Sequence, residues 1–351
     1  MGIGCEKNYA AKRKRVNQVR NFLLFLFVCS SLSLFSKDEE SYPTFSVDGW
    51  LKGKYEYATS TDKSRFSVRS SRIGVKGNLT KQFSYRALVE LNDNGALKPL
   101  DLYAGFNPIE GLTITFGQRT IPLFNAYTVI PADLMFSNRA FLGKYLMATR
   151  DIGVLAMYAF NIGTLPASAE FGLYNGNVIN DPAWHDTPSY GGRLAFGNMK
   201  GFRTTYKFYN HTSQKNPDIH YLTYGADLRY EGDNWKAETE IMKRDDKALD
   251  MENLLSYYLQ GAYAFPLKEH YIFKSVVPAF RWEGIDLKSD LKGFDVNRLT
   301  LGLGFGLTKE HFSSILRFDY EKYLVNNRLG IMSLTPEMDS DKFTVELLLR
   351  F

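Results

Sequence analysis

The sequence has almost no cysteine, because Cys5 and Cys29 are the only two in 351 residues. Two cysteines cannot build a multi-disulfide scaffold or a four-cysteine zinc site. Long hydrophobic runs are also missing. The most apolar stretch, from Phe22 to Leu34, is shorter than the roughly 20 residues that a membrane-spanning helix needs. A membrane protein built from several helical spans is therefore excluded.

Aromatic residues, in contrast, are abundant. The chain contains 22 Tyr and 26 Phe, and 44% of its residues are hydrophobic while 23% are charged. This composition differs from that of disordered or collagen-like chains and is sufficient for a large fold.

The first 36 residues have the order of a secretory signal peptide. Basic residues at 12–15 precede the apolar stretch that begins at Phe22, and small residues follow as far as Ser36. This order predicts a signal peptide over 1–36, cleaved after Ser36, and a mature domain over 37–351. An uncleaved N-terminal anchor helix is the alternative.

The basic character of the chain belongs to this leader. The whole chain has 43 basic and 38 acidic residues, of which six basic and one acidic lie in the leader, so the mature part has 37 of each. A formally neutral mature chain gives no indication of a nucleic-acid partner. Both cysteines also lie in the leader, and a cysteine-free exported chain is consistent with a bacterial envelope location.

Beyond the leader, apolar residues recur at every second position. In 343–351, Phe343, Val345, Leu347, Leu349 and Phe351 alternate mainly with polar residues, and 299–307 repeats the pattern with leucine and phenylalanine against threonine and glycine. This alternation is typical of strands that have one apolar and one polar face. The segments are about 10 residues long, which is the length of a tilted membrane-spanning strand. Strands of a soluble sandwich are usually shorter, about 5–6 residues.

The pattern therefore predicts an all-β fold, an antiparallel transmembrane β-barrel of about sixteen strands, with apolar side chains facing lipid and polar side chains lining a lumen. Between Val68 and Ile73 the apolar residues change from even-numbered to odd-numbered positions. This shift of the alternation predicts a bulge in the second segment. The sixteen segments are 44–59, 65–79, 83–93, 96–106, 112–119, 150–160, 165–174, 189–196, 202–211, 218–230, 234–244, 254–265, 275–286, 294–307, 311–323 and 341–351.

The connections between these segments alternate in length. Those after even-numbered segments are mostly short, whereas the long ones, above all Thr120 to Thr149, follow odd-numbered segments. Outer-membrane barrels have short periplasmic turns and longer extracellular loops. The even count places both termini on the periplasmic side.

Several motifs in the first third of the mature chain carry a family resemblance. They are Ser71–Gly77 (SRIGVKG), Asp101–Phe106 (DLYAGF), Gly111–Gln118 (GLTITFGQ) with Pro122, and Arg150–Val154 (RDIGV). In this order and spacing the chain resembles the porin family of the phosphate-selective porins O and P.

The resemblance implies a sixteen-stranded outer-membrane porin that assembles as a homotrimer in the bacterial outer membrane, in contact with its lipid. It also implies that the third extracellular loop, here Thr120 to Thr149, folds inward as a constriction. Phosphate-selective members of the family use inward Arg and Lys side chains, so we expect passive diffusion of small hydrophilic solutes with a preference for anions, phosphate among them.

Strand parity and the loop position together give the candidate channel-lining residues. Rings of Arg or Lys lower the cost of moving an anion out of bulk water, although inward charges can also simply pair with one another. The candidates are Arg72, Lys76, Arg86, Asp101, Arg119, Arg139, Arg150, Arg193, Arg203 and Arg281.

Other functions need features that are weaker in this sequence. A non-conducting adhesin or structural barrel would need large outer loops. An outer-membrane hydrolase would need a His-activated nucleophile, and only His311 and Ser313 share a strand face. No metal-ligand spacing or phosphate-binding glycine loop occurs. We therefore expect no enzymatic activity and no cofactor.

Overall fold

The computed structural model describes residues 42–68, 70–91, 95–121, 123, 125, 131–146, 150–177, 179–182, 184, 186–213, 219–247, 253–268, 272–288, 293–327 and 340–351. The predicted signal peptide at 1–36 lies outside these residues, as does Pro122 of the family motif.

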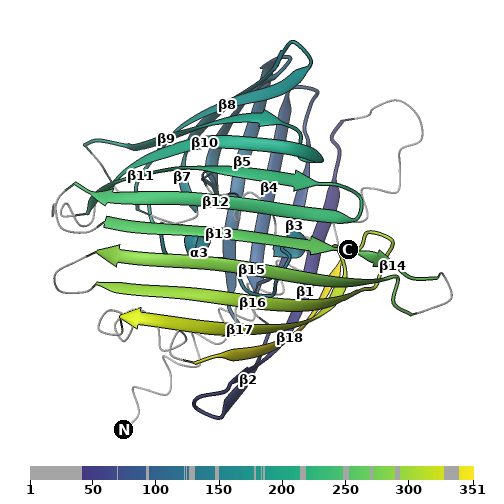
Figure 1. The fold of residues 1–351 in the computed structure, drawn as a ribbon. Helices are drawn as coiled ribbons and strands as arrows, with labels where there is room; N and C mark the ends of the chain where they lie inside the picture. The colour runs from purple at the N-terminus through teal and green to yellow at the C-terminus, as the bar shows by residue number, and fades with distance from the viewer. Residues whose placement is uncertain are drawn as a thin grey trace, which may run out of the picture.

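All strands belong to one antiparallel sheet that closes on itself. The closure joins β1 to β18, with Trp50 opposite Arg350 and Ala58 opposite Lys342, so that purple and yellow strands meet in Figure 1. The strands are β1 (Ser46–Ala58), β2 (Lys63–Ser67), β3 (Ser71–Asn78), β4 (Phe83–Leu91), β5 (Leu97–Ile109), β6 (Leu112–Thr120), β7 (Arg150–Ile162), β8 (Leu165–Tyr174), β9 (Ser189–Gly197), β10 (Gly201–Thr212), β11 (His220–Glu231), β12 (Trp235–Asp246), β13 (Asn253–Tyr263), β14 (Phe265–Pro266), β15 (Ser275–Lys288), β16 (Phe294–Gly306), β17 (Ile315–Asn327) and β18 (Lys342–Arg350).

The eighteen labels correspond to sixteen barrel strands, as the sequence predicted. β2 and β3 are two parts of one predicted segment, because both pair with β1 and the register shifts by one residue between them. Ser70, in the break, has a positive φ of 68°, and its carbonyl accepts a hydrogen bond from Trp50 Nε1 at 2.7 Å. β14 similarly continues β13 beyond Ala264, pairing with β15 as β13 does. The predicted bulge in the second segment is confirmed.

One predicted boundary is wrong. The segment 311–323 begins only at Ile315, where β17 pairs with Gly306 of β16. The residues before it form a turn, in which the Leu307 N–H donates to the Ser314 carbonyl at 2.8 Å. Phe312 of this turn belongs to a buried apolar cluster with Trp50 and Phe136. Its side chain therefore packs inside the barrel and does not face lipid from a strand.

Short and long connections alternate around the barrel, as expected. The turn at Gly111, between β5 and β6, contrasts with the long connection from β6 to β7 on the other rim. The two ends of the barrel sequence share the short-turn rim, where Gly49 and Phe351 exchange backbone hydrogen bonds of 3.0 and 3.1 Å. The long-loop rim is therefore the extracellular one.

The barrel is apolar outside and polar inside. Leu51 of β1 is 58% exposed while its neighbour Lys52 is 5% exposed, and Phe116 of β6 is 67% exposed. Because side chains alternate along a strand, this pattern places hydrocarbon on one face of every strand and charges on the other.

The inward-facing loop predicted after the fifth strand is present in its described part. Residues 131–146 contain a 3-10 turn, η2 (Pro131–Asp133), and a short helix, α3 (Phe141–Tyr145). α3 lies against β13 and β15 within the ring of strands (Figure 1). Among the described residues, no helix is long and apolar enough to cross a membrane.

Candidate permeation path

The lumen is divided by the segment 131–146, and an open cavity of about 520 Å³ remains along β1 and β3–β9. We call it the lumen cavity. Eight basic and three acidic side chains line it, together with Trp50, Leu88, Thr120, Pro131 and Met157. The basic residues are Arg72, Lys76, Arg86, Arg119, Arg139, Arg150, Arg193 and Arg350, and the acidic residues are Asp48, Asp101 and Glu170.

Most of these charges are held by ion pairs with carboxylates on nearby strands or on the segment 131–146. Arg150 Nε lies 2.7 Å from Asp101 Oδ1, Arg86 Nη1 lies 3.0 Å from Asp48 Oδ1, and Lys76 Nζ lies 3.5 Å from Asp48 Oδ2. Three further pairs are Arg72 with Glu90 at 2.7 Å, Arg193 with Glu170, and Arg350 with Asp133 at 2.9 Å. These pairs hold the basic side chains along the wall, and Asp48 pairs with both Arg86 and Lys76.

Arg119 is different, because among the described residues it has no carboxylate within ion-pair distance. Its Nη1 donates to Thr115 Oγ1 at 2.9 Å, and its guanidinium carbon lies 5.3 Å from the ring centre of Tyr103. Within the described part of the chain its Nε has no hydrogen-bond partner. A stacked guanidinium keeps its charge and its donors. Arg119 therefore presents an uncompensated positive charge to the lumen cavity.

The opposite part of the lumen is closed by packing. Phe141, Leu142 and Leu146 join a buried apolar cluster with residues of β12, β13, β15 and β16, among them Met242 and Tyr258. Apolar side chains on 131–146 and on the inner wall thus exclude water from this side. The open space of the lumen therefore lies on the side of the lumen cavity.

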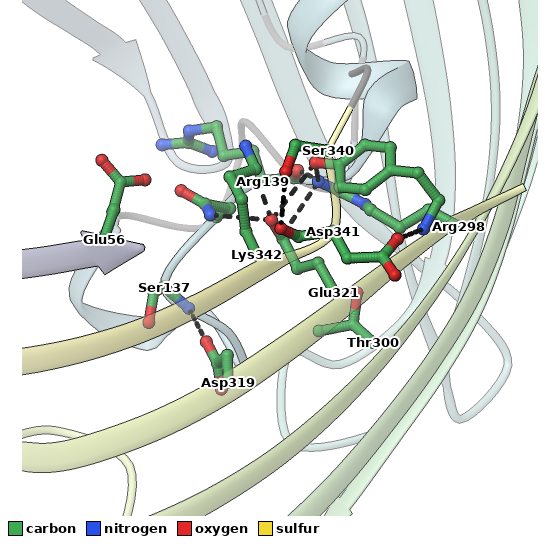
Figure 2. A network of polar contacts seen from close by, with 12 residues as sticks. Glu56, Ser137, Arg139, Arg298, Thr300, Asp319, Glu321, Ser340, Asp341 and Lys342 are labelled. Atoms are coloured by element: carbon green, nitrogen blue, oxygen red, sulfur yellow. Dashed lines mark hydrogen bonds and ion pairs between the residues drawn. The ribbon is translucent and has the colours of Figure 1, made fainter. Parts of the chain in front are cut away.

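Buried charged side chains of the wall, which also pair with one another, hold the segment by hydrogen bonds. Glu283 Oε2 accepts the Phe141 N–H at 2.5 Å, and Glu283 Oε1 lies 2.6 Å from Arg298 Nη2. Arg298 also donates to the Arg139 carbonyl at 2.8 Å and pairs with Glu321 Oε1 at 2.8 Å. The Ser137 N–H donates to Asp319 Oδ2 at 2.7 Å, as Figure 2 shows. Asn125 lies earlier in the same loop, and its Nδ2 donates to Glu238 Oε2 at 2.6 Å.

Two of the sequence-derived candidates serve this attachment and do not line the lumen cavity. Arg281 is 2% exposed, pairs with Glu283 at 2.7 Å and donates to the Asn138 carbonyl at 2.9 Å. Arg203 donates to Asn125 Oδ1 at 2.6 Å. The other eight candidates, from Arg72 to Arg193, all lie along the lumen cavity.

Two smaller cavities continue toward the extracellular rim. A cavity of about 220 Å³, which we call the vestibule, is lined by Lys54, Lys144, Arg298 and others, and it shares Arg139 and Pro131 with the lumen cavity. A further cavity of about 300 Å³ shares Glu56, Arg65 and Lys342 with the vestibule and includes Ser340. The three cavities therefore form a series, and Arg139 is the charged side chain that lines both sides of the junction between vestibule and lumen.

Asp341, which directly precedes β18, carries a negative charge beside Ser340 (Figure 2). Burial would raise the pKa of Asp341, but hydrogen bonds from Lys322 Nζ at 2.6 Å and the Tyr323 N–H at 2.9 Å hold the pKa below its usual value. The carboxylate stays ionised at neutral pH, and Lys322 balances its charge.

Sequence reasoning left out several residues of the path. Lys54 and Arg350 follow the same alternation as the chosen candidates, so strand parity alone would have found them. Glu283 follows this alternation too, because it lies two positions after Arg281 on β15, but its role in holding the inward segment depends on contacts that only the structure shows. Asn125 has no such signal.

The residues considered for catalysis precede the strand in which the sequence placed them. His311 and Ser313 lie in the turn before β17, and His311 Nδ1 has no hydrogen-bond partner among the described residues. The described residues also hold no group of three His, Cys, Asp or Glu side chains that could bind a metal ion.

No protein-family model matches the chain, and no curated protein matches it. Solved structures do match. The outer-membrane channel DcaP of Acinetobacter baumannii aligns with a TM-score of 0.61 and 13% identity over 91% of this chain and 100% of that one. An anion-selective porin from Comamonas acidovorans aligns with a TM-score of 0.58 and 14% identity over 88% and 100%. The trimer form of OmpT, an outer-membrane protein of Vibrio cholerae, aligns with a TM-score of 0.60 and 10% identity over 89% and 100%.

At these identities the likeness shows a shared fold. Closed barrels satisfy every backbone hydrogen bond within the membrane, and this barrel has an apolar exterior from Leu51 to Leu349. The chain therefore has the sixteen-stranded fold of outer-membrane porins, and its apolar exterior places it in an outer membrane.

Proposed function

We propose that the chain is a porin that passes small hydrophilic solutes by diffusion and prefers anions. The observation that carries this proposal is the lining of the lumen cavity, with eight basic against three acidic side chains. A barrel of sixteen strands is too wide for side chains alone to fill, and rings of Arg and Lys favour anions in a pore. We assign the selecting field to Arg119 and Arg139, with Arg72, Lys76, Arg86, Arg150 and Arg193 supporting it.

Phosphate is the anion that the family resemblance favours. A guanidinium can bind phosphate oxygens in a bidentate manner, and Arg119 has donors that are not taken by a carboxylate among the described residues. Arg139 lines both the vestibule and the lumen cavity. Phosphate preference is thus a specific form of the anion preference and is tested with it.

Single-channel recordings in planar bilayers test both statements. In asymmetric KCl we expect a reversal potential whose sign shows that chloride is more permeant than potassium, because the lumen cavity has an excess of fixed positive charge. Added phosphate should reduce the chloride current if it binds at Arg119 and Arg139. A potassium-preferring reversal potential would reject the anion preference, and an unaltered chloride current would reject phosphate binding. The absence of any conductance would instead support a structural or adhesive barrel.

We also propose that the mature protein begins at Lys37 and forms a homotrimer. The leader carries the signal-peptide order described above, and the barrel shares its fold with a protein solved in a trimer form. Native mass spectrometry of protein extracted from the membrane should give three copies of a chain that starts at Lys37. A mass that includes residues 1–36 would show an anchor, and a monomer mass would reject the trimer.

A further inference from the structure

The exterior of the barrel carries an apolar hollow of about 800 Å³ across β8–β12. Its outward-facing walls include Phe171, Tyr206, Phe208 and Ile241, and its lining also includes Gly192 and Ala226. Tyr206 and Ile241 are 57% and 51% exposed, so the hollow opens outward, to the side where the membrane lies.

Strand register explains why the surface is hollow here. Gly192 of β9 lies opposite Phe171 of β8 and Phe208 of β10, and Ala226 of β11 lies opposite Tyr206 of β10 and Ile241 of β12. Cross-strand partners share a face of the sheet. Two small residues therefore stand between large ones on the outer face, and the large side chains form the sides of a depression.

A polar group marks one rim of the hollow. Lys243, which lines it, lies two positions beyond Ile241 on the same face of β12, and its Nζ lies 2.7 Å from Asp245 Oδ1. The Tyr224 hydroxyl donates to Asp245 Oδ2 at 3.1 Å. β12 ends at Asp246 on the long-loop rim, which is the level of the outer-leaflet headgroups.

The Lys243 ammonium is able to take a second anionic partner. An ammonium has three N–H donors, Asp245 is its one ion-pair partner among the described residues, and the Lys243 side chain is 43% exposed. A lysine near the end of a membrane-spanning segment reaches toward the headgroup region.

We propose that the hollow binds one acyl chain of an outer-leaflet lipid whose anionic phosphate headgroup is held by Lys243. The apolar lining faces membrane hydrocarbon, and the one cation at its rim lies where a headgroup phosphate would lie. A second copy of the chain is the other possible occupant. The charge complementarity at Lys243 favours the lipid, because Asp245 already satisfies one donor and a phosphate would add a second acceptor from outside the sheet.

Native mass spectrometry of the full protein in mild detergent tests this proposal, with dimyristoyl phosphatidylglycerol and dimyristoyl phosphatidylcholine as separate probes. Ala226→Leu fills the depression and should weaken binding of both lipids by about fivefold. Lys243→Gln should remove the preference for phosphatidylglycerol while leaving phosphatidylcholine binding unchanged. The matched control is Ala104→Leu, since Ala104 is an exposed alanine on β5 opposite Tyr85 and Phe116.

Each outcome separates the occupants. Equal lipid binding by Ala226→Leu and Ala104→Leu would overturn the proposal and leave only general solvation by lipid. A change of oligomer mass in Ala226→Leu alone would also overturn it, because a second copy would then occupy the hollow. Reversal potentials should stay unchanged in all three variants. The lipid site and the channel selectivity are therefore tested independently of each other.

Discussion

Replacing both Arg119 and Arg139 by glutamate should change the sign of the reversal potential in asymmetric KCl. Arg119 has no carboxylate partner among the described residues, and Arg139 lines both the vestibule and the lumen cavity. A unit charge acts on an ion about 6 Å away with about 0.7 kcal/mol in a water-like dielectric. Two reversals therefore change the energy of an ion by about 3 kcal/mol before salt screening.

Planar-bilayer recordings measure this change, and low ionic strength should enlarge it because screening is then weaker. The double variant Arg119→Lys with Arg139→Lys keeps both charges and should keep the anion preference. Lys200→Glu is the control for net charge, since Lys200 is exposed in the short turn between β9 and β10 and does not line the lumen cavity. A change of selectivity in Lys200→Glu as large as that of the glutamate pair would reject the assignment to Arg119 and Arg139.

Glu283→Ala should enlarge the pore. Glu283 is fully buried and accepts the Phe141 N–H, and it pairs with Arg281 and Arg298. Removing one partner of a buried ion pair leaves an uncompensated charge and costs about 3–5 kcal/mol. We expect α3 to leave the wall, so that single-channel conductance rises and the thermal midpoint of the barrel falls.

The control for this variant is Asp227→Ala. Asp227 is buried on β11 and pairs with Lys207, without a contact to 131–146 among the described residues. It should lower the thermal midpoint by a similar amount and leave conductance unchanged. If Glu283→Ala lowered stability without raising conductance, the segment would be held by the apolar packing of Phe141, Leu142 and Leu146, and the ion pairs would not fasten it.

Strand positions could be predicted well from the sequence because alternation is a local property. Apart from the two segments that the structure divides and the one that begins late, each predicted segment agrees with its strand to within three residues at either end. The error at 311–323 came from Phe312, whose apolar side chain continued the alternation although it packs inside the barrel. A period of two cannot distinguish a lipid-facing side chain from one that a turn folds inward.

The sequence by itself determined the closed barrel, the strand number, and the face on which each charge lies, because these follow from alternation and from the lengths of the connections. Only the tertiary structure decided what each inward charge does. Arg119 and Arg281 have the same parity and the same chemistry, yet Arg119 faces the lumen cavity and Arg281 is buried under 131–146. The physical reason is that a loop can pack against any part of the inner wall, and the wall that it covers becomes dry while the opposite wall stays in contact with water.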